Sequence, residues 1–393
     1  MAPTPRFKAD SSPALFSAGF RPFFLLGAIW AGAAIALWLP AYFGELTIAT
    51  AFSPRDWHIH EMLYGYVSAV VAGFLLTAIP NWTGRLPLQG WPLVGLTACW
   101  IIGRIAVAFS AFIGGWVAAG FDLLFLTLLI SVAARELSHG AQNHNIRVLA
   151  VLCVFLVGNV IFHVEALVEG EADYGVRIGL AAVLTLIMLI GGRIVPSFTR
   201  NWLARENPGP LPAAPGRFDL VAIAAAAAAL LAWVIVPTAR ATGAALILAA
   251  GLHAIRLARW RGERTWRDRL VFVLHIGYFF VPLGFLATGL SVFGLAPVSA
   301  GVHLWTVGAV GTMTLAVMSR ASLGHTGRAL VASANVQAVY VLVIAAALVR
   351  ACAALLPDWS AALLIASGVA WISAFLGFAG SYWIILTHPR RLR

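Results

Sequence analysis

The chain has 393 residues, of which 61% are hydrophobic and only 10% are charged. A soluble domain carries about 25% charged residues, so this composition leaves too little polar surface to face water on every side and excludes such a domain. The formal net charge of +11 comes almost wholly from arginine, since Lys8 is the only lysine. The arginines stand between apolar runs rather than on one polar face, which argues against nucleic-acid binding.

Apolar runs long enough to cross a bilayer recur along the whole chain. A bilayer core of about 30 Å needs roughly 20 residues of helix. The runs that meet this length predict about twelve spans, at 19–43, 58–80, 92–110, 113–137, 146–167, 174–195, 218–238, 241–260, 270–293, 298–319, 330–356 and 360–387. We therefore expect an all-α polytopic transmembrane bundle, with tails at 1–18 and 388–393 and a single transmembrane domain at 19–387.

The basic residues predict the orientation of these spans. With the N-terminus in the cytoplasm, the outer side holds only Arg55, Arg177, Arg240 and Arg350, and Arg104 falls within a span. All other basic residues then lie on the inner side, where loops of membrane proteins are enriched in arginine and lysine. Both tails are therefore expected to be cytoplasmic.

Two distant parts of the sequence share one spaced pattern. His60 and His303 each stand 23 residues before the threonine of a Thr-Gly-Arg motif, and a glycine follows each histidine five residues later. Residues 196–200 (Pro-Ser-Phe-Thr-Arg) echo residues 80–83 (Pro-Asn-Trp-Thr) without a matching histidine. Because these segments fall in the second, sixth and tenth predicted spans, they suggest a threefold repeat of four helices.

Four histidines share one depth near the outer face in this topology: His58, His60, His163 and His303. Ionisable groups at membrane depth are costly and are functional hypotheses by default, and neutral imidazole suits copper, iron and zinc. We predict a metal site, with hydrogen-bonded interfacial anchors as the alternative. Residues two apart on a regular helix point to nearly opposite sides, so His58 and His60 would share one metal only where the helix has not begun.

A second pair, His253 and His275, is expected at similar depth near the inner side, on the hairpin of the eighth and ninth spans. These residues are candidate axial ligands of a heme, or one ligand each to separate centres. The alternative is a hydrogen bond between the two helices. The sequence has no CxxCH motif, so any heme would be bound non-covalently.

Charged residues accompany both groups of histidines. Arg104 and Asp122 flank the Gly-Gly turn at 114–115 and each lie nine residues from Ile113, which predicts an ion pair, and the alternative partner of Arg104 is a heme propionate. Glu61 and Glu165 lie beside the outer histidines and are candidate proton donors to a metal site. Their alternative roles are a helix-terminal charge for Glu61 and a solvated helix end for Glu165.

Five long motifs resemble the NnrS family. They are FSAGFRPFFLLG at 16–27, WHIHEMLYG at 57–65, GFLLTAIPNWTGR at 73–85, GGRIVPSFTRNW at 191–202 and GTMTLAVMSRASLGHTGR at 311–328. The resemblance implies a bacterial inner-membrane protein of the nitric oxide response that holds heme b and copper. The histidines that correspond to the family's motif residues are His58, His60, His163, His253, His275, His303 and His325.

The resemblance implies nitric oxide as the ligand, a surrounding of membrane lipid and an electron donor that the sequence does not identify. Two activities are consistent with it: reduction of two nitric oxide molecules to nitrous oxide by a reductase-type oxidoreductase, and protective binding of nitric oxide without turnover. A third class of function is transport of copper or another small solute, which internal repeats and prolines within spans allow.

Overall fold

The computed structural model describes residues 13–138 and 146–389, and within these ranges all regular structure is helical. Twelve of the described helices are long and apolar enough to cross a membrane, which confirms the predicted all-α polytopic fold. Most of the two predicted tails, 1–18 and 388–393, lies outside the described residues, so their place in the cytoplasm stays a prediction.

The spans are, in chain order, α1 (Phe20–Tyr42), the continuous run of α2 (Pro54–His60), η2 (Glu61–Tyr66) and α3 (Val67–Thr83), α4 (Trp91–Ala108), α6 (Gly115–Ser138), α7 (Ile146–Val168), α8 (Tyr174–Glu206), α9 (Arg217–Ile235), α10 (Arg240–Ala258), α11 (Arg269–Ser291), the run of α12 (Val298–His303), η5 (Leu304–Gly311) and α13 (Thr312–His325), α14 (Ala334–Leu355) and α15 (Ser360–Thr387). Short helices lie between them: η1 (Ala14–Phe16), α5 (Ser110–Ile113), η4 (Gly262–Thr265) and η6 (Pro357–Trp359).

The main difference from the predicted boundaries concerns prolines inside helices. The predicted sixth span stops at residue 195, whereas α8 continues to Glu206 with Pro196 in its interior. The predicted second span stops at residue 80, whereas α3 continues to Thr83 with Pro80 inside it. A proline removes one backbone hydrogen bond from a helix, but membrane helices tolerate this because neighbouring groups satisfy the freed carbonyl.

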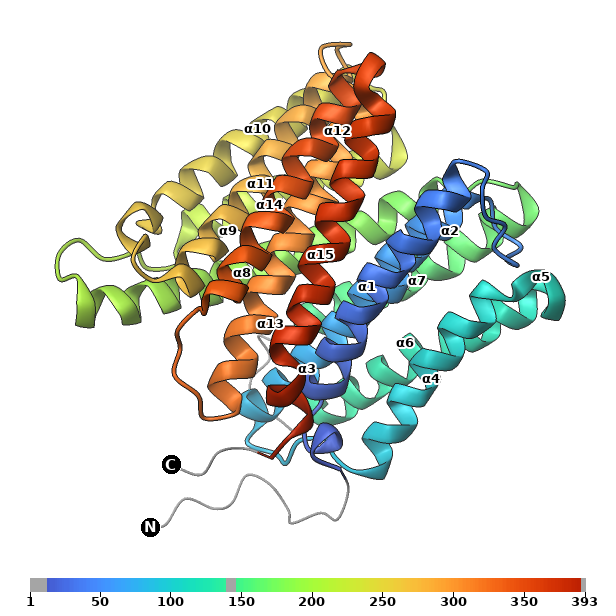
Figure 1. Ribbon diagram of the computed structural model, residues 1–393. Coiled ribbons are helices and arrows are strands. Elements are labelled where there is room, and N and C mark those ends of the chain that lie inside the picture. The colour runs from blue at the N-terminus through green and yellow to red at the C-terminus, as the bar shows by residue number, and fades with distance from the viewer. Residues whose placement is uncertain (1–12, 139–145, 390–393) are drawn as a thin grey trace. The chain divides into compact units, whose positions relative to one another are not determined.

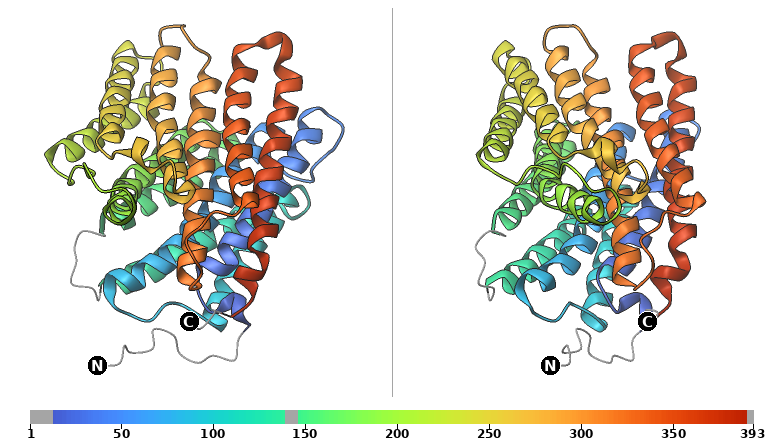
Figure 2. Two further views of the ribbon diagram at one scale, coloured as in Figure 1. Left: turned by 60° about the vertical axis from the view of Figure 1, so that its left-hand side comes forward. Right: turned by 90° about the vertical axis from the view of Figure 1, so that its left-hand side faces the viewer.

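The described chain divides into two compact units. Figures 1 and 2 show the helices of both. The described part of the first unit comprises residues 13–138, 146–179, 321–328 and 378–389, and the second unit comprises residues 180–320 and 329–377. Within the first unit α1 packs along α3, and α6 packs against both α4 and α7. Within the second unit α10 packs between α9 and α11, and α14 packs against α12 and η5.

Two spans contain a π-helical segment at equivalent positions. The segment η2 begins directly after His60, and η5 begins directly after His303. In η2 the carbonyl oxygen of Gly65 accepts hydrogen bonds from Trp100 Nε1 at 2.9 Å and from Ser68 Oγ at 2.8 Å. Because π-helical turns are rare and frequent at functional sites, their shared position supports the repeat that the sequence suggests around these two histidines.

Candidate metal centre

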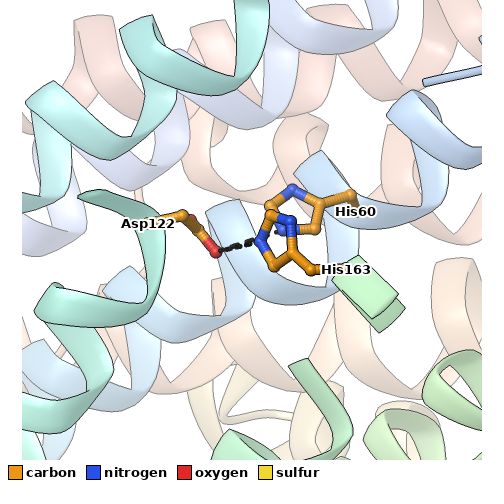
Figure 3. A group of neighbouring side chains, drawn as sticks. All are labelled: His60, Asp122 and His163. Atoms are coloured by element: carbon orange, nitrogen blue, oxygen red, sulfur yellow. Dashed lines mark hydrogen bonds and ion pairs between the residues drawn. The ribbon is translucent and has the colours of Figure 1, made fainter. Parts of the chain in front are cut away.

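Three side chains from three helices of the first unit converge on one point (Figure 3). His60 is the last residue of α2, Asp122 lies on α6 and His163 lies on α7. The Nε2 atoms of His60 and His163 lie 3.2 Å and 3.0 Å from the same Asp122 oxygen, Oδ2. All three residues are buried, with exposed fractions of 0%, 1% and 2% for His60, His163 and Asp122. Two imidazoles and a carboxylate are a ligand set for copper, iron or zinc.

The start of α2 decides which of the two neighbouring histidines joins this cluster. Ser53 caps the helix by accepting a hydrogen bond from the Asp56 backbone N–H at 3.2 Å, so the helix is established before His58. The two histidines therefore point in different directions. His60 enters the cluster, whereas the ring of His58 stacks on Trp38 with centroids 4.1 Å apart.

Glu61 orients the imidazole of His60. The Nδ1 atom of His60 lies 2.9 Å from Glu61 Oε1. Because an ionised carboxylate only accepts hydrogen bonds, Nδ1 carries the hydrogen and the Nε2 lone pair faces the cluster. Trp30 Nε1 also donates to Glu61 Oε2 at 2.8 Å, and Arg104 Nη1 lies 2.7 Å and 2.8 Å from the two oxygens. These donors favour an ionised orienting group, and the proton-donor role of Glu61 stays a prediction.

Arg104 joins the two carboxylates of the site. Its Nη2 donates to Asp122 Oδ1 while its Nη1 donates to Glu61, so the predicted pair between Arg104 and Asp122 is confirmed and has a second partner. Gly65 makes room for the guanidinium, because a Cβ at this position would lie 2.5 Å from Arg104 Nη1 and 2.8 Å from Glu61 Oε2. Both terminal nitrogens of the guanidinium, Nη1 and Nη2, therefore have a carboxylate partner in the protein.

The cluster has an excess of negative charge and of hydrogen-bond acceptors. Two carboxylates face one guanidinium, which leaves one negative charge over when the imidazoles are neutral. The His60 Nε2 lone pair meets two acceptors, Asp122 Oδ2 at 3.2 Å and Asn159 Oδ1 at 3.2 Å. Asn159 is held in this orientation because its Nδ2 donates to Asp122 Oδ2 at 2.8 Å. Acceptors that converge in this way require a proton or a bound cation between them.

Glu165 has a structural place beside the cluster. Its carboxylate accepts hydrogen bonds from three backbone N–H groups at the start of α8: those of Asp173 at 3.1 Å, Tyr174 at 2.9 Å and Gly175 at 2.8 Å. The side chain is buried rather than solvated, with 6% exposed. An acidic group at this end of a helix is stabilised by the unpaired N–H groups and the helix dipole. This geometry favours a capping role, and proton donation by Glu165 stays a prediction.

In the second unit, His253 has protein partners at both ring nitrogens. Its Nε2 donates to the carbonyl oxygen of Ala222 at 3.1 Å, so Nδ1 carries the lone pair and accepts from the Tyr278 hydroxyl at 2.9 Å. The same hydroxyl accepts from Arg256 Nη1 at 2.7 Å, and Arg256 Nε is paired with Asp219 at 2.9 Å. The residues around His253 form a closed network of hydrogen bonds.

His275 lies in the same group of aromatic rings and is also held by the protein. Trp260 lies 4.5 Å from Tyr278 and 6.5 Å from His275 between ring centroids. Thr199 Oγ1 donates to the carbonyl of Val195 at 2.8 Å and therefore accepts from His275 Nε2, also at 2.8 Å. The remaining nitrogen, Nδ1, is buried beside Gly262, where a Cβ would collide with it, and has no hydrogen-bond partner within the described residues.

The remaining predicted site histidines lie elsewhere. His303 belongs to the second unit, where its Nδ1 donates to the Ser299 carbonyl at 2.7 Å. His325 ends α13 within the first unit, and its ring lies 5.6 Å from that of Phe20. The assignment of His58, His303 and His325 to a metal site stays a prediction.

Two members of the cluster were not predicted as site residues. The sequence predicts Asp122 only as the partner of Arg104 and gives no prediction for Asn159. A signal for Asn159 does exist, because it stands four residues before His163 and thus on the same face of α7. A polar residue one turn from a buried histidine indicates a shared polar cluster.

A helical protein with twelve potential membrane spans and a buried histidine–carboxylate cluster is a multi-pass membrane protein with a candidate metal centre. The sequence matches the family model described as NnrS protein over residues 14–390, so the chain belongs to the NnrS family. No curated protein matches the sequence.

Proposed function

We propose that this chain binds nitric oxide at a copper ion held by His60, His163 and Asp122. The observation that carries the metal site is the convergence of the His60 Nε2 lone pair with two acceptor oxygens in a buried, negatively charged cluster. The choice of copper as the metal rests on the two imidazoles, which suit this metal, and on the family resemblance. Nitric oxide as the ligand follows from the resemblance alone.

The residues of the cluster have distinct roles in this proposal. His60 and His163 supply the imidazole ligands, and Glu61 fixes the ring nitrogen that His60 presents. Such a carboxylate partner orients a metal-binding histidine and raises its basicity. Arg104 fixes Asp122, and the burial of the cluster excludes water. When bound, copper supplies a position for the ligand and a one-electron redox couple.

The arrangement around His253 does not fit axial ligation of a heme, because both of its ring nitrogens have protein partners. His275 has Nε2 paired with Thr199 and Nδ1 against the Gly262 backbone. The proposal therefore assigns no step to a heme at this pair. With an electron donor, reduction would convert two nitric oxide molecules to nitrous oxide with two electrons and two protons, and binding without turnover is the alternative.

The test is copper content after purification and loading in detergent, measured by elemental analysis and electron paramagnetic resonance. His60→Ala, His163→Ala and Asp122→Asn should each lose most of the bound copper. His58→Ala is the matched control, since it removes a neighbouring imidazole that stacks on Trp38, and it should retain copper. Equal copper content in all four variants and the wild type would refute the site.

Nitric oxide is then added anaerobically to the copper-loaded protein. A change in the copper spectrum that His163→Ala abolishes supports binding. Formation of nitrous oxide in the presence of a reductant distinguishes turnover from binding alone. A copper-loaded protein whose spectrum is unaffected by nitric oxide would separate the metal from this ligand and favour the transport hypothesis.

A further inference from the structure

The phenyl ring of Phe52 lies against both histidines of the cluster. Its centroid is 5.5 Å from the ring of His60 and 5.5 Å from the ring of His163. It also meets Phe162 edge-on at 5.7 Å, and only 7% of Phe52 is exposed. One apolar side chain therefore covers the two imidazoles that converge on Asp122.

The position of Phe52 in the chain places it on the loop side of the cluster. Phe52 precedes α2 by two residues, whereas His60 lies six residues into that helix, about 9 Å below its start at 1.5 Å per residue. His163 lies five residues before the end of α7 at the same end of the unit. Phe52 is therefore a residue of the loop at this end of the unit that contacts both imidazoles.

The segment that carries Phe52 is anchored to α5. Ser110 Oγ accepts the Ala51 backbone N–H at 2.7 Å and lies 3.2 Å from Thr50 Oγ1. The Ala111 backbone N–H donates to the carbonyl of Ala49 at 3.0 Å. Ser110 is itself 2% exposed. Residues 49–51 are thus held in place directly before Phe52, and Ser110 is the side chain that holds them.

We propose that Phe52 controls access to the His60–His163 pair and selects small uncharged ligands over charged or hydrated ones. This inference rests on the proposed copper site. A diatomic uncharged molecule passes an aromatic ring with small side-chain movements and loses little hydration. An anion or a hydrated ion must shed water against the same apolar ring, and burying charge without a partner is costly. Movement of the ring, with residues 49–52, is the step that admits such species.

The experiment measures the rate at which copper-loaded protein in detergent loses copper to bathocuproine disulfonate, a charged chelator of copper(I), under reducing conditions. Phe52→Ala removes two ring contacts with the histidines and should release copper about tenfold faster than the wild type. Phe52→Leu and Ser110→Ala should fall between the two, the latter because it removes the hydrogen bonds that hold Thr50 and Ala51 while the ring remains. Phe155→Leu is the matched control, since this buried ring packs on Tyr64 at 4.9 Å.

A second experiment compares the binding rates of a charged and an uncharged ligand, azide and nitric oxide, at the copper site. Azide, an anion, should bind faster in Phe52→Ala, whereas the binding rate of nitric oxide should change much less. Release and azide rates that are equal in Phe52→Ala, Ser110→Ala and Phe155→Leu would overturn the inference. A wild-type protein that holds no copper would instead refute the proposed function, and this inference with it. The copper content of each variant is measured before the release experiment. A content equal to that of the wild type shows that a faster release reflects easier access and not loss of the metal site.

Discussion

Replacement of Arg104 by leucine tests the charge balance of the buried cluster most directly. The guanidinium is 3% exposed and is the cation that faces both Glu61 and Asp122. Without it, two buried carboxylates remain close together, and breaking one buried ion pair costs about 3–5 kcal/mol. Trp30 and Asn159 still donate to the two carboxylates at 2.8 Å each, so we expect a loss within this range rather than twice it.

The free energy of unfolding is measured for metal-free protein by titration of mixed micelles with a denaturing detergent, so that metal binding by Asp122 does not contribute. Arg85→Leu is the control, because this arginine also pairs with a carboxylate, Glu136 at 2.6 Å, but is 42% exposed. Its loss should cost less than about 1 kcal/mol. Adding Asp122→Asn to Arg104→Leu should recover about 1–2 kcal/mol, since it removes one unpaired charge. An effect of Arg104→Leu no larger than that of Arg85→Leu would refute the reasoning.

Three further predictions use other parts of the chain. Glu165→Ala should lower the free energy of unfolding by about 1–3 kcal/mol, because three backbone N–H groups lose their acceptor, while copper content is retained; normal stability with lost turnover would instead support a proton donor. Tyr278→Phe should lower the free energy of unfolding by about 1–3 kcal/mol in the same assay, since the hydroxyl donates to His253 and accepts from Arg256. An unchanged free energy would contradict that network. Reporter fusions should place the loop at Glu169 outside and the loop at Arg264 inside, and finding both on one side would contradict the predicted orientation.

Depth along the membrane could be predicted from the sequence because it depends only on counting residues from the ends of the spans. Arg104 and Asp122 each lie nine residues from Ile113, and this equal spacing predicted an ion pair that the structure confirms. Span counting also placed His60 and His163 at one depth, and these two rings lie 4.9 Å apart. Direction around each helix could not be predicted in the same way, because apolar residues surround membrane helices on every side. The sequence allows His58 and His60 to share a metal only where the helix has not begun, and the structure separates them because α2 begins at Pro54.

Other parts of the site depend on contacts that leave no pattern in the sequence. Phe52 and Trp30 belong to the apolar majority of the chain, and only their neighbours in space distinguish them from lipid-facing residues. Glu165 was expected at a solvated helix end because the loop that follows α7 is acidic. It is buried because the start of α8 folds back over it and offers three N–H groups. Such a partner, eight to ten residues away, is fixed by the path of the loop rather than by helical spacing.

The π-helical segment η2 sets the azimuth of His60 around the axis of its span. An α-helix turns by about 100° per residue, so one residue more or less between His60 and α3 changes the direction of the ring by that angle. A single-residue deletion within Glu61–Tyr66 would let the span continue as regular α-helix. We expect such a deletion to rotate His60, whose Nε2 now lies 3.2 Å from Asp122 Oδ2, away from that carboxylate, while α3 keeps its packing on α1. The direction of the His60 side chain around the helix axis therefore depends on the number of residues in this segment, while Glu61 within it orients the imidazole ring.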